Sequence, residues 1–195
     1  MISLGGSVRP TDLRPRVCDV EMPSELAAYL AGAMDADGSI GVRRSTYAMR
    51  VRGDARQPTF SERICFKQVT PEVPELLKAT FGGSLMIQSP SATNGRPLYY
   101  WEATDAVAAR ALGLMLPYLR IKRAQAENCL ALRQSKERPR SETHIHRDAV
   151  PSSTGTGTHS IRRLEVAPEV IAEREAIYLR AKELNRVGIP GRAVR

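Results

Sequence analysis

The chain has 195 residues, enough for one domain with a sizeable core, and its hydrophobic and charged fractions, 42% and 26%, are those of a globular protein. Lys and Arg number 29 against 21 Asp and Glu, so the formal net charge is +8. A basic excess of this size favours a polyanionic partner, with nucleic acid ahead of an anionic membrane. No apolar run reaches the roughly 20 residues of a membrane-spanning helix, which argues against a membrane protein.

The cysteines and the N-terminal sequence indicate an intracellular protein. Cys18, Cys65 and Cys129 are odd in number and widely spaced, so they fit neither a zinc site nor a redox pair. The sequence MISLGGSVRPTDLRPRV lacks the apolar stretch of a secretory signal. We therefore expect reduced thiols and a cytoplasmic location, which leaves an organelle or a phage-infected host open.

An arm and a helix come first along the chain. Residues 1–22 contain Pro, Gly and Arg without periodicity, so we expect a flexible N-terminal arm. In the next segment, PSELAAYLAGAMDADG, apolar residues fall at helical spacing after Pro23 and Ser24, and Gly38 is a natural helix stop. The pattern predicts a helix over residues 23–38.

Two predicted hairpins with a helix between them follow. SIGVRRSTYAMRVRG has the β-branched, aromatic and Arg residues of a strand, and TFSERICFKQVT is predicted to be its antiparallel partner. PEVPELLKATFGG predicts a short helix that ends at Gly82 and Gly83. SLMIQS and RPLYYWEAT, separated by PSATNG, predict the second hairpin.

The rest of the chain is predicted to be mainly helical. DAVAARALGLML and the amphipathic RIKRAQAENCLALRQSK predict two helices, and PEVIAEREAIYLRAKELNRVG predicts a final one that ends at Gly188. Residues 136–163 are polar and rich in turn residues, so we expect a long mobile loop there. The expected organisation is one α+β domain over residues 23–188, between the arm and a C-terminal tail over 189–195.

The end of the first predicted helix, LAGAMDADGS, combines small residues with acids. Asp35 and Asp37 would lie against the negative end of the helix dipole, which is unfavourable unless positive charge lies nearby. Exposed acids in a turn explain this segment equally well when it is taken alone.

The same segment resembles the LAGLIDADG signature of homing endonucleases and differs from it at Ala33 and Met34, which are both apolar. The predicted α-β-β-α-β-β-α order matches the core of that family. LPYLRIKRAQAENCLAL resembles the family segment in which a Pro, an aromatic residue and a Lys precede a packed helix, and AIYLRAKELNRVG resembles the family's final helix. The resemblance covers residues 23–135 and 168–188. It implies an α+β fold whose antiparallel sheet forms a DNA-binding saddle, in an enzyme of a mobile genetic element.

The resemblance further implies a homodimer, because the chain carries a single copy of the motif. In such a dimer the small residues Ala28, Ala31 and Gly32 would let two copies of the helix approach closely. Each copy would deliver Asp37 to the centre of the saddle, where Asp37 and the Ala36 carbonyl would bind Mg²⁺ or another divalent cation such as Mn²⁺. Oxygen ligands suit Mg²⁺, and metal-dependent hydrolysis of phosphodiesters would cut a long, near-palindromic double-stranded DNA target.

Two further residues are implied to be catalytic. Lys122 corresponds to a basic residue that the family places near the active site, where it can stabilise phosphate charge or tune a water molecule. Gln68 corresponds to a Gln near the end of the second strand in some relatives, and a shift of one residue would turn its side chain to the other face. Asp35 is expected to be structural, through capping and local hydrogen bonds.

The first predicted hairpin would carry the DNA-reading surface. In its second strand, Ile64 and Phe66 should point into the core, which turns the residues between and beside them towards the DNA. A twisted β-ribbon fits the major groove, and Arg is the commonest reader of guanine. A solvated polar face is the alternative, which the net charge makes less favourable. The residues expected to face DNA are Arg43, Ser45, Tyr47, Arg63, Cys65 and Lys67.

One segment departs from the family pattern. TPEVPELLK follows the second predicted strand, where relatives often carry polar and basic residues at the lip of the catalytic pocket, and no basic residue occurs between Lys67 and Lys78. Because the departure weakens cleavage more than binding, a DNA- or RNA-binding protein that does not cleave, such as a maturase or a regulator, is the alternative. A tight helix crossing in an unrelated enzyme is the third possibility.

Overall fold

The computed structural model describes residues 22–45, 57–88, 95–147 and 163–186. The predicted α-β-β-α-β-β-α-α order is confirmed, and the structure adds α5, β5 and β6 before the last helix. The elements are α1 (Ser24–Asp37), β1 (Gly38–Ser45), β2 (Thr59–Gln68), α2 (Glu72–Phe81), β3 (Ser84–Gln88), β4 (Leu98–Thr104), α3 (Asp105–Met115), α4 (Arg123–Glu137), α5 (Arg140–Thr143), β5 (His144–Arg147), β6 (Arg163–Val166) and α6 (Pro168–Arg186).

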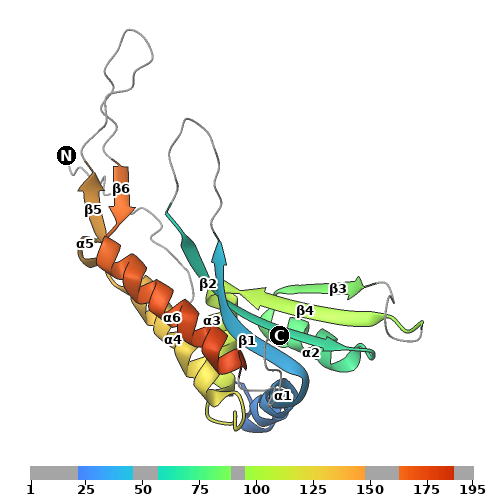
Figure 1. Ribbon diagram of the computed structural model, residues 1–195. Helices are drawn as coiled ribbons and strands as arrows, with labels where there is room; N and C mark the ends of the chain where they lie inside the picture. The colour runs from blue at the N-terminus through green and yellow to red at the C-terminus, as the bar shows by residue number, and fades with distance from the viewer. Residues whose placement is uncertain (1–21, 46–56, 89–94, 148–162, 187–195) are drawn as a thin grey trace, which may run out of the picture.

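The centre of the fold is a four-stranded antiparallel sheet in the order β1-β2-β4-β3 (Figure 1). Its two hairpins, β1–β2 and β3–β4, join through β2 and β4, where Ile64 pairs with Ala103 and Arg63 pairs with Thr104. Because side chains alternate across a strand, each register pair assigns a row of residues to one face of the sheet. Among the described residues, the helices pack on one face, and we call the opposite face, which carries Arg43, Arg63 and Glu102, the open face.

The core lies between the helices and the covered face of the sheet. Ile64 and Phe66 are buried there as predicted, and Trp101 of β4 is fully buried beside them. The Trp101 indole Nε1 donates to the Gly82 carbonyl at 2.9 Å, so the one polar atom of this large side chain is satisfied. The helices contribute Leu30, Met34, Leu77, Leu112, Met115 and Cys129, and the segment between α3 and α4 contributes Leu119.

Gly38, the first residue of β1, directly follows α1. A glycine is needed there for a steric reason rather than for the left-handed conformation that is typical of a helix stop. Its φ of −77° is available to any residue, so no left-handed conformation is required. A Cβ atom at this position would lie 1.8 Å from Met34 Sδ and 2.7 Å from the Met34 carbonyl oxygen. Since Met34 is fully buried, only glycine lets the strand leave the helix at this point.

The segment expected to be a loop at 136–163 contains regular structure at both of its ends. α4 continues to Glu137, and α5 and β5 follow before the strand β5 pairs with β6. Gln57 fixes this small sheet, because its Nε2 donates to the Val166 carbonyl at 2.9 Å and its Oε1 accepts from the Val166 amide at 3.0 Å. Strands this short carry too few residues for a periodic pattern. The remainder, residues 148–162, lies outside the described part.

Other boundaries differ from the prediction by a few residues. α4 begins at Arg123 rather than at residue 120, and Lys122 is its N-cap residue. Met22, the last residue of the expected arm, packs against the core. The rest of the arm, residues 1–21, and the chain from 187 onwards lie outside the described residues. Among the helices that are described, none is both long and apolar enough to cross a membrane.

Helices α4 and α6 cover the outer edge of β1. Cys129 Sγ of α4 donates to the Gly41 carbonyl at 3.2 Å, and Asn185 Nδ2 of α6 donates to the Ile40 carbonyl at 3.1 Å. Burial, followed by the charge of Glu62, raises the pKa of the Cys129 thiol to about 12, so Cys129 remains a donor. These bonds protect an edge strand and bring α6 beside the open face of the sheet.

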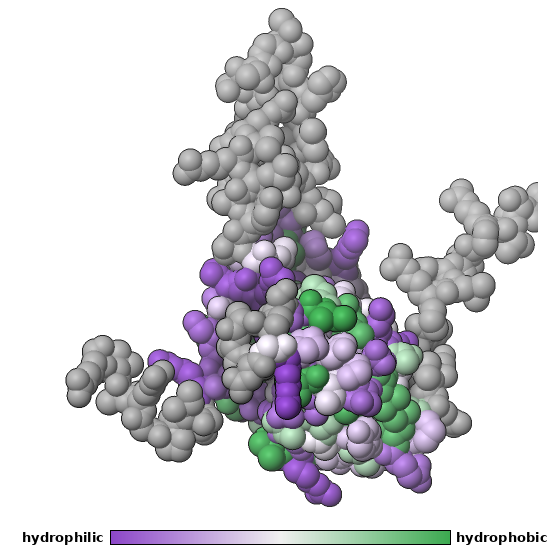
Figure 2. Space-filling model, turned by 90° about the vertical axis from the view of Figure 1, so that its right-hand side faces the viewer, coloured by the Kyte–Doolittle hydropathy of each residue, from purple (hydrophilic) through white to green (hydrophobic). Residues whose placement is uncertain are grey.

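The surface beside β3, at the opposite edge of the sheet from β1, differs from the surface beside β1. Figure 2, which views the molecule from the right-hand side of Figure 1, where β3, β4 and α2 lie, shows hydrophobic residues interspersed with hydrophilic ones. Met86 and Ile87 of the edge strand β3 are 47% and 66% exposed. Met86 pairs in register with Tyr100 and therefore adds an apolar side chain to the open face at the β3 edge.

Candidate functional site

Lys122 lies against the C-terminal end of α1. Its Nζ donates to the carbonyl oxygens of Met34 and Asp35, both at 2.8 Å, and lies 3.4 Å from the Ala36 carbonyl oxygen. Desolvation lowers the pKa of Lys122, and the charges of Asp35 and Asp37 act in the opposite direction. A cation here offsets the negative end of the helix dipole, which explains how the helix accommodates acids at its end.

Asp35 binds the segment that precedes α4. Its Oδ2 accepts from the backbone N–H groups of Arg120 and Ile121 at 2.7 and 3.2 Å, and its Oδ1 accepts from the Lys122 N–H at 2.8 Å. Desolvation acts to raise the pKa of Asp35, but these backbone hydrogen bonds and Lys122 lower it overall. Asp35 is therefore structural, as expected, although its partners are far away in the sequence rather than local.

Asp37 is the exposed acid at the end of α1. It directly precedes Gly38, which pairs with Phe66 near the end of β2, so Asp37, Lys122 and the end of β2 lie at the same end of the sheet. Gln68, the last residue of β2, shares the parity of Phe66 and therefore points to the helix side rather than the open side. Its side chain is half-buried, and its buried Oε1 has no hydrogen-bond partner among the described residues.

The oxygen atoms at this end fit a divalent cation only in part. The Asp37 carboxylate is exposed and is a ligand type that Mg²⁺ prefers. The Ala36 carbonyl, the second expected ligand, instead lies 3.4 Å from the Lys122 ammonium, which opposes a dication at that oxygen. Within the described ranges no group of three or more His, Cys, Asp and Glu residues could hold a metal ion. Of the two expected ligands, the Asp37 carboxylate is therefore the one whose surroundings fit a cation.

The small residues expected at a dimer interface divide between two faces of α1. Ala31 is fully buried in the core of its own chain and so does not belong to the expected interface, because its helical position matches that of Ala27 and Met34. Ala28 and Gly32 are exposed on the other side. The face of α1 that is exposed among the described residues includes Glu25, Ala28, Tyr29, Gly32 and Ala36.

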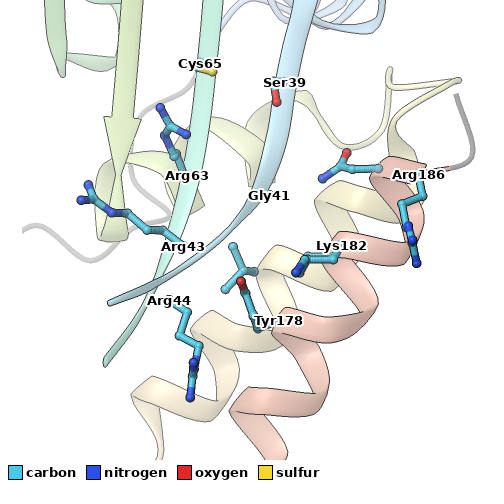
Figure 3. A pocket seen from close by; sticks show the side chains of 12 residues that line it. Ser39, Gly41, Arg43, Arg44, Arg63, Cys65, Tyr178, Lys182 and Arg186 are labelled. Atoms are coloured by element: carbon cyan, nitrogen blue, oxygen red, sulfur yellow. The ribbon is translucent and has the colours of Figure 1, made fainter. Parts of the chain in front are cut away.

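The residues expected to face DNA share the open side of the sheet. Gly41 pairs with Arg63 and Ser39 with Cys65, so the odd-numbered residues of β1 and β2 lie on one face. Arg43 and Arg63 extend to this side in Figure 3, whereas Arg44 extends towards the helices. Arg43 and Lys67 are exposed, and Ser45, Arg63 and Cys65 are half-buried. Tyr47 lies outside the described residues.

Arg63 is held in a network at the centre of the open face. Its Nε donates to Glu102 Oε1 at 2.5 Å and its Nη2 donates to the Tyr100 hydroxyl at 2.7 Å. The Tyr100 hydroxyl donates to Glu102 Oε2 at 2.8 Å, and Lys67 Nζ lies 4.8 Å from the centre of the Tyr100 ring. β4 therefore contributes to a surface that the sequence assigned to β1 and β2 alone.

The same network shifts the pKa values of its members. Desolvation acts to raise the pKa of Glu102, but the hydrogen bonds from Arg63 and Tyr100 lower it overall. The hydrogen bond to Glu102 raises the pKa of Arg63, although desolvation opposes it. Desolvation, followed by the hydrogen bond to Glu102, raises the pKa of Tyr100 to about 12. At neutral pH the network is a carboxylate, a guanidinium and a neutral phenol.

A basic wall on α6, Lys182 and Arg186, borders the open face and was missed by the sequence analysis. A pocket of about 520 Å³ lies between this wall and β1, and its lining includes Arg43 and Asn185. Figure 3 shows Lys182 extending from α6 towards the strands. Arg44 also lines this pocket, and its Nε lies 2.8 Å from Glu175 Oε2. The spacing of four residues between Lys182 and Arg186 was the signal in the sequence.

Comparison with solved structures identifies the fold. The homing endonuclease I-CvuI, solved in complex with the I-CreI target in the presence of Mg with the DNA not cleaved, superposes with a TM-score of 0.54. That match has 16% identity and covers 88% of this chain and 87% of that chain. The archaeal intron-encoded homing endonuclease I-Vdi141I, complexed with DNA, gives a TM-score of 0.51 at 12% identity and covers 87% of both chains.

The meganuclease I-SmaMI bound to uncleaveable DNA gives a TM-score of 0.52 at 15% identity, covering 91% of this chain and 50% of that one. No protein-family model matches the chain, and no curated protein matches it. At these identities the likeness establishes the fold alone. The chain has the α+β fold of LAGLIDADG homing endonucleases, with its antiparallel sheet, as the motif and the element order predicted.

Proposed function

We propose that the protein is a site-specific double-strand DNA endonuclease that acts as a homodimer and requires a divalent metal ion. The observation that carries the proposal is the arrangement at the end of α1, where the exposed Asp37 carboxylate lies close to the Lys122 ammonium at one end of a basic sheet face. An acid and a cation at the edge of a basic surface are groups that phosphodiester hydrolysis uses.

The open face of the sheet would bind duplex DNA. Arg43, Arg63 and Lys67 project from it, and a twisted antiparallel sheet of this kind fits the major groove. Lys182 and Arg186 of α6 border the same face and would contact the phosphates of one strand. The net charge of +8 supports this surface because phosphate contacts dominate the affinity of proteins for DNA.

Two copies of the chain would be needed for cleavage of both strands. Each chain has one Asp37, and the exposed face of α1 with Ala28 and Gly32 allows a second helix to approach closely. Asp37 of each protomer would hold Mg²⁺ or Mn²⁺, which when bound neutralises phosphate charge and activates water. Lys122 would stabilise phosphate charge from its fixed position beside α1. Gln68, at the end of β2, would assist catalysis at the same end of the sheet.

A second candidate is a DNA- or RNA-binding protein that does not cleave. The contact of Lys122 with the Ala36 carbonyl favours it, because an ammonium lies beside this carbonyl where the metal ion was expected. The exposed acids Glu72 and Glu75 in the first turn of α2 also favour it. Hydrogen bonds from its own backbone and from the Thr70 side chain lower the pKa of Glu72, so that this acid is charged after β2, where phosphates would approach.

Selection from a randomised duplex library tests both candidates. The protein is incubated with the library in Mg²⁺ and in excess chelator, and bound and cut molecules are sequenced separately. Cuts at one long, near-palindromic site in Mg²⁺, together with a dimer in sedimentation analysis, support the endonuclease. A specific duplex that is bound in both conditions and never cut supports the second candidate. Failure to bind any DNA duplex at low salt contradicts the endonuclease and a DNA-binding role of the second candidate, because phosphate contacts are strongest there.

A further inference from the structure

Glu102 is a carboxylate in the middle of the surface proposed to bind DNA. In the sheet it pairs with Cys65 of β2 on one side and with Ser84 of β3 on the other, so it lies among the central residues of the open face. A negative charge at this position repels phosphate, which makes it unfavourable for general DNA binding. Its side chain is 20% exposed, so DNA on this face would lie close to it.

Glu102 determines which donors of Arg63 are free. Glu102 Oε1 accepts from Nε, and the Tyr100 hydroxyl, itself bound to Glu102 Oε2, accepts from Nη2. Both bonds use the side edge of the guanidinium and fix its plane. The Nη1 protons and the second Nη2 proton have no partner among the described residues, and the Arg63 side chain is 43% exposed. The guanidinium therefore keeps Nη donors that a ligand on the open face can bind.

A pair of parallel Arg donors matches the O6 and N7 acceptors of guanine in the major groove. An unrestrained Arg would turn as readily to a phosphate, where it adds affinity without sequence information. The carboxylate beside Arg63 makes a phosphate an unfavourable neighbour, whereas a base edge carries no net charge. Glu102 therefore disfavours the non-specific contact as well as orienting the specific one.

We propose that Glu102 is a specificity-determining residue that acts through Arg63: with Tyr100, it holds the Arg63 guanidinium so that this side chain reads one guanine in each half of the target. The inference rests on the proposed DNA binding and adds a residue of β4 that the sequence pattern did not assign to the interface. Glu102 is a positioning residue, and Arg63 is the group that touches the base.

The test uses the duplex selected from the randomised library and versions of it with each base pair replaced in turn. Arg63→Ala is expected to lose about 10- to 100-fold of discrimination at one base pair in each half-site and to leave the other positions unchanged. Glu102→Gln, which keeps the shape and removes the charge, is expected to lose discrimination at the same base pair. It should also bind all duplexes more tightly, because a phosphate-repelling charge is gone. Tyr100→Phe should give a smaller loss at the same base pair.

The control is Glu127→Gln, which removes one negative charge from the exposed ion pair with Arg123 on α4. This variant should discriminate among the duplexes as the wild-type protein does. In the double variant Arg63→Ala, Glu102→Gln, discrimination should equal that of Arg63→Ala alone, because Glu102 acts only through Arg63.

Two results overturn the inference while leaving the proposed function intact. One is an unchanged base preference in Glu102→Gln together with a loss in Arg63→Ala. The other is a Glu102→Gln protein whose affinity for every duplex rises by the same factor, which would make Glu102 a general repulsive charge. If the wild-type protein selects no duplex, the proposed function fails and the inference fails with it. Thermal unfolding of each variant shows whether a loss reflects the contact or the fold.

Discussion

Adjacent residues of β2 form ion pairs on opposite faces of the sheet. Glu62 points to the covered face and is fully buried, and its Oε2 accepts from Arg133 Nη2 at 3.1 Å and from Lys136 Nζ at 2.8 Å, both on α4. Arg63 points to the open face and pairs with Glu102. Both sets of ion pairs join a carboxylate to basic side chains, but the Glu62 carboxylate is buried and the Arg63–Glu102 pair is partly exposed.

The difference in burial gives the two pairs different consequences. Arg133 and Lys136 have side chains only 16% and 20% exposed, so removing Glu62 would leave Arg133 without its carboxylate partner and with little access to water, whereas Lys136 would keep its pair with Asp105. The Arg63 side chain is 43% exposed and can be solvated or bound by a ligand. The buried pair therefore joins α4 to the sheet, and the open pair is available for recognition. Burial rather than residue type therefore distinguishes the pair that stabilises the fold from the pair proposed to act in DNA recognition.

The largest effect on stability is expected from Glu62→Ala. It removes the carboxylate partner of Arg133 and one of the two carboxylate partners of Lys136, which also pairs with Asp105, and breaking a buried pair typically costs about 3–5 kcal/mol. Unfolding by denaturant should show a decrease of this size in the free energy of unfolding. The fraction of the variant that still folds should keep the wild-type base preference. Glu127→Ala is the matched control, because its pair with Arg123 is exposed and should contribute about 0.5 kcal/mol or less. Equal losses in the two variants would contradict the comparison.

Asp35→Asn is expected to have an intermediate effect. Asp35 is only partly buried, but its carboxylate accepts from the backbone N–H groups of Arg120, Ile121 and Lys122. Loss of such a cap costs about 1–2 kcal/mol. The same denaturant experiment measures it, and Glu25→Gln, at an exposed site in the first turn of α1, is the control. A loss below that of the control would show that these bonds do not hold α1 to the segment before α4.

Glu102→Gln is expected to change stability by less than about 1 kcal/mol, because pairs this exposed contribute little to folding. This substitution should instead change DNA recognition, whereas Glu62→Ala should lower stability and leave the base preference unchanged. A loss of stability as large as that of Glu62→Ala would place the Arg63 network in the fold rather than in the binding surface. Denaturant unfolding and duplex binding on the same samples separate the two outcomes.

The smallest effect is expected from Lys182→Ala on α6. One phosphate contact would be lost, so binding to all duplexes should weaken similarly and the slope of log affinity against log salt should fall by about one. Lys78→Ala, at an exposed position of α2, gives the comparison and should leave the slope unchanged. A change in base preference in Lys182→Ala would show that α6 contacts bases rather than phosphates.

The sequence predicts those elements whose local pattern agrees with their packing. α1, β2 and α2 lie within a few residues of their predicted bounds because helical spacing, alternation and Gly stops coincide there. Asp37 and Lys122 were brought together only through a resemblance, since no local pattern relates residues that far apart. Their proximity depends on the hydrogen bonds between Asp35 and the segment before α4.

The remaining features depend on tertiary contacts. Glu102 reaches the open face because β2 pairs with β4, and no signal within either strand specifies that register. Ala31 carries the same small side chain as Ala28, and only the orientation of α1 on the core separates their roles. The partner of Gln57, Val166, is more than a hundred residues away, so the small β5–β6 sheet could not be anticipated from the turn-rich composition.

The central claim is that Asp37 carries the chemistry while Asp35, its neighbour in the motif, carries structure. The most direct measurement is the Mg²⁺-dependent cleavage of the selected duplex by wild-type protein, Asp37→Asn and Asp35→Asn, with the affinity for the duplex measured on the same samples. We predict that Asp37→Asn binds with wild-type affinity, unfolds at the wild-type denaturant concentration and does not cut. Cleavage by Asp37→Asn at the wild-type rate would contradict the account.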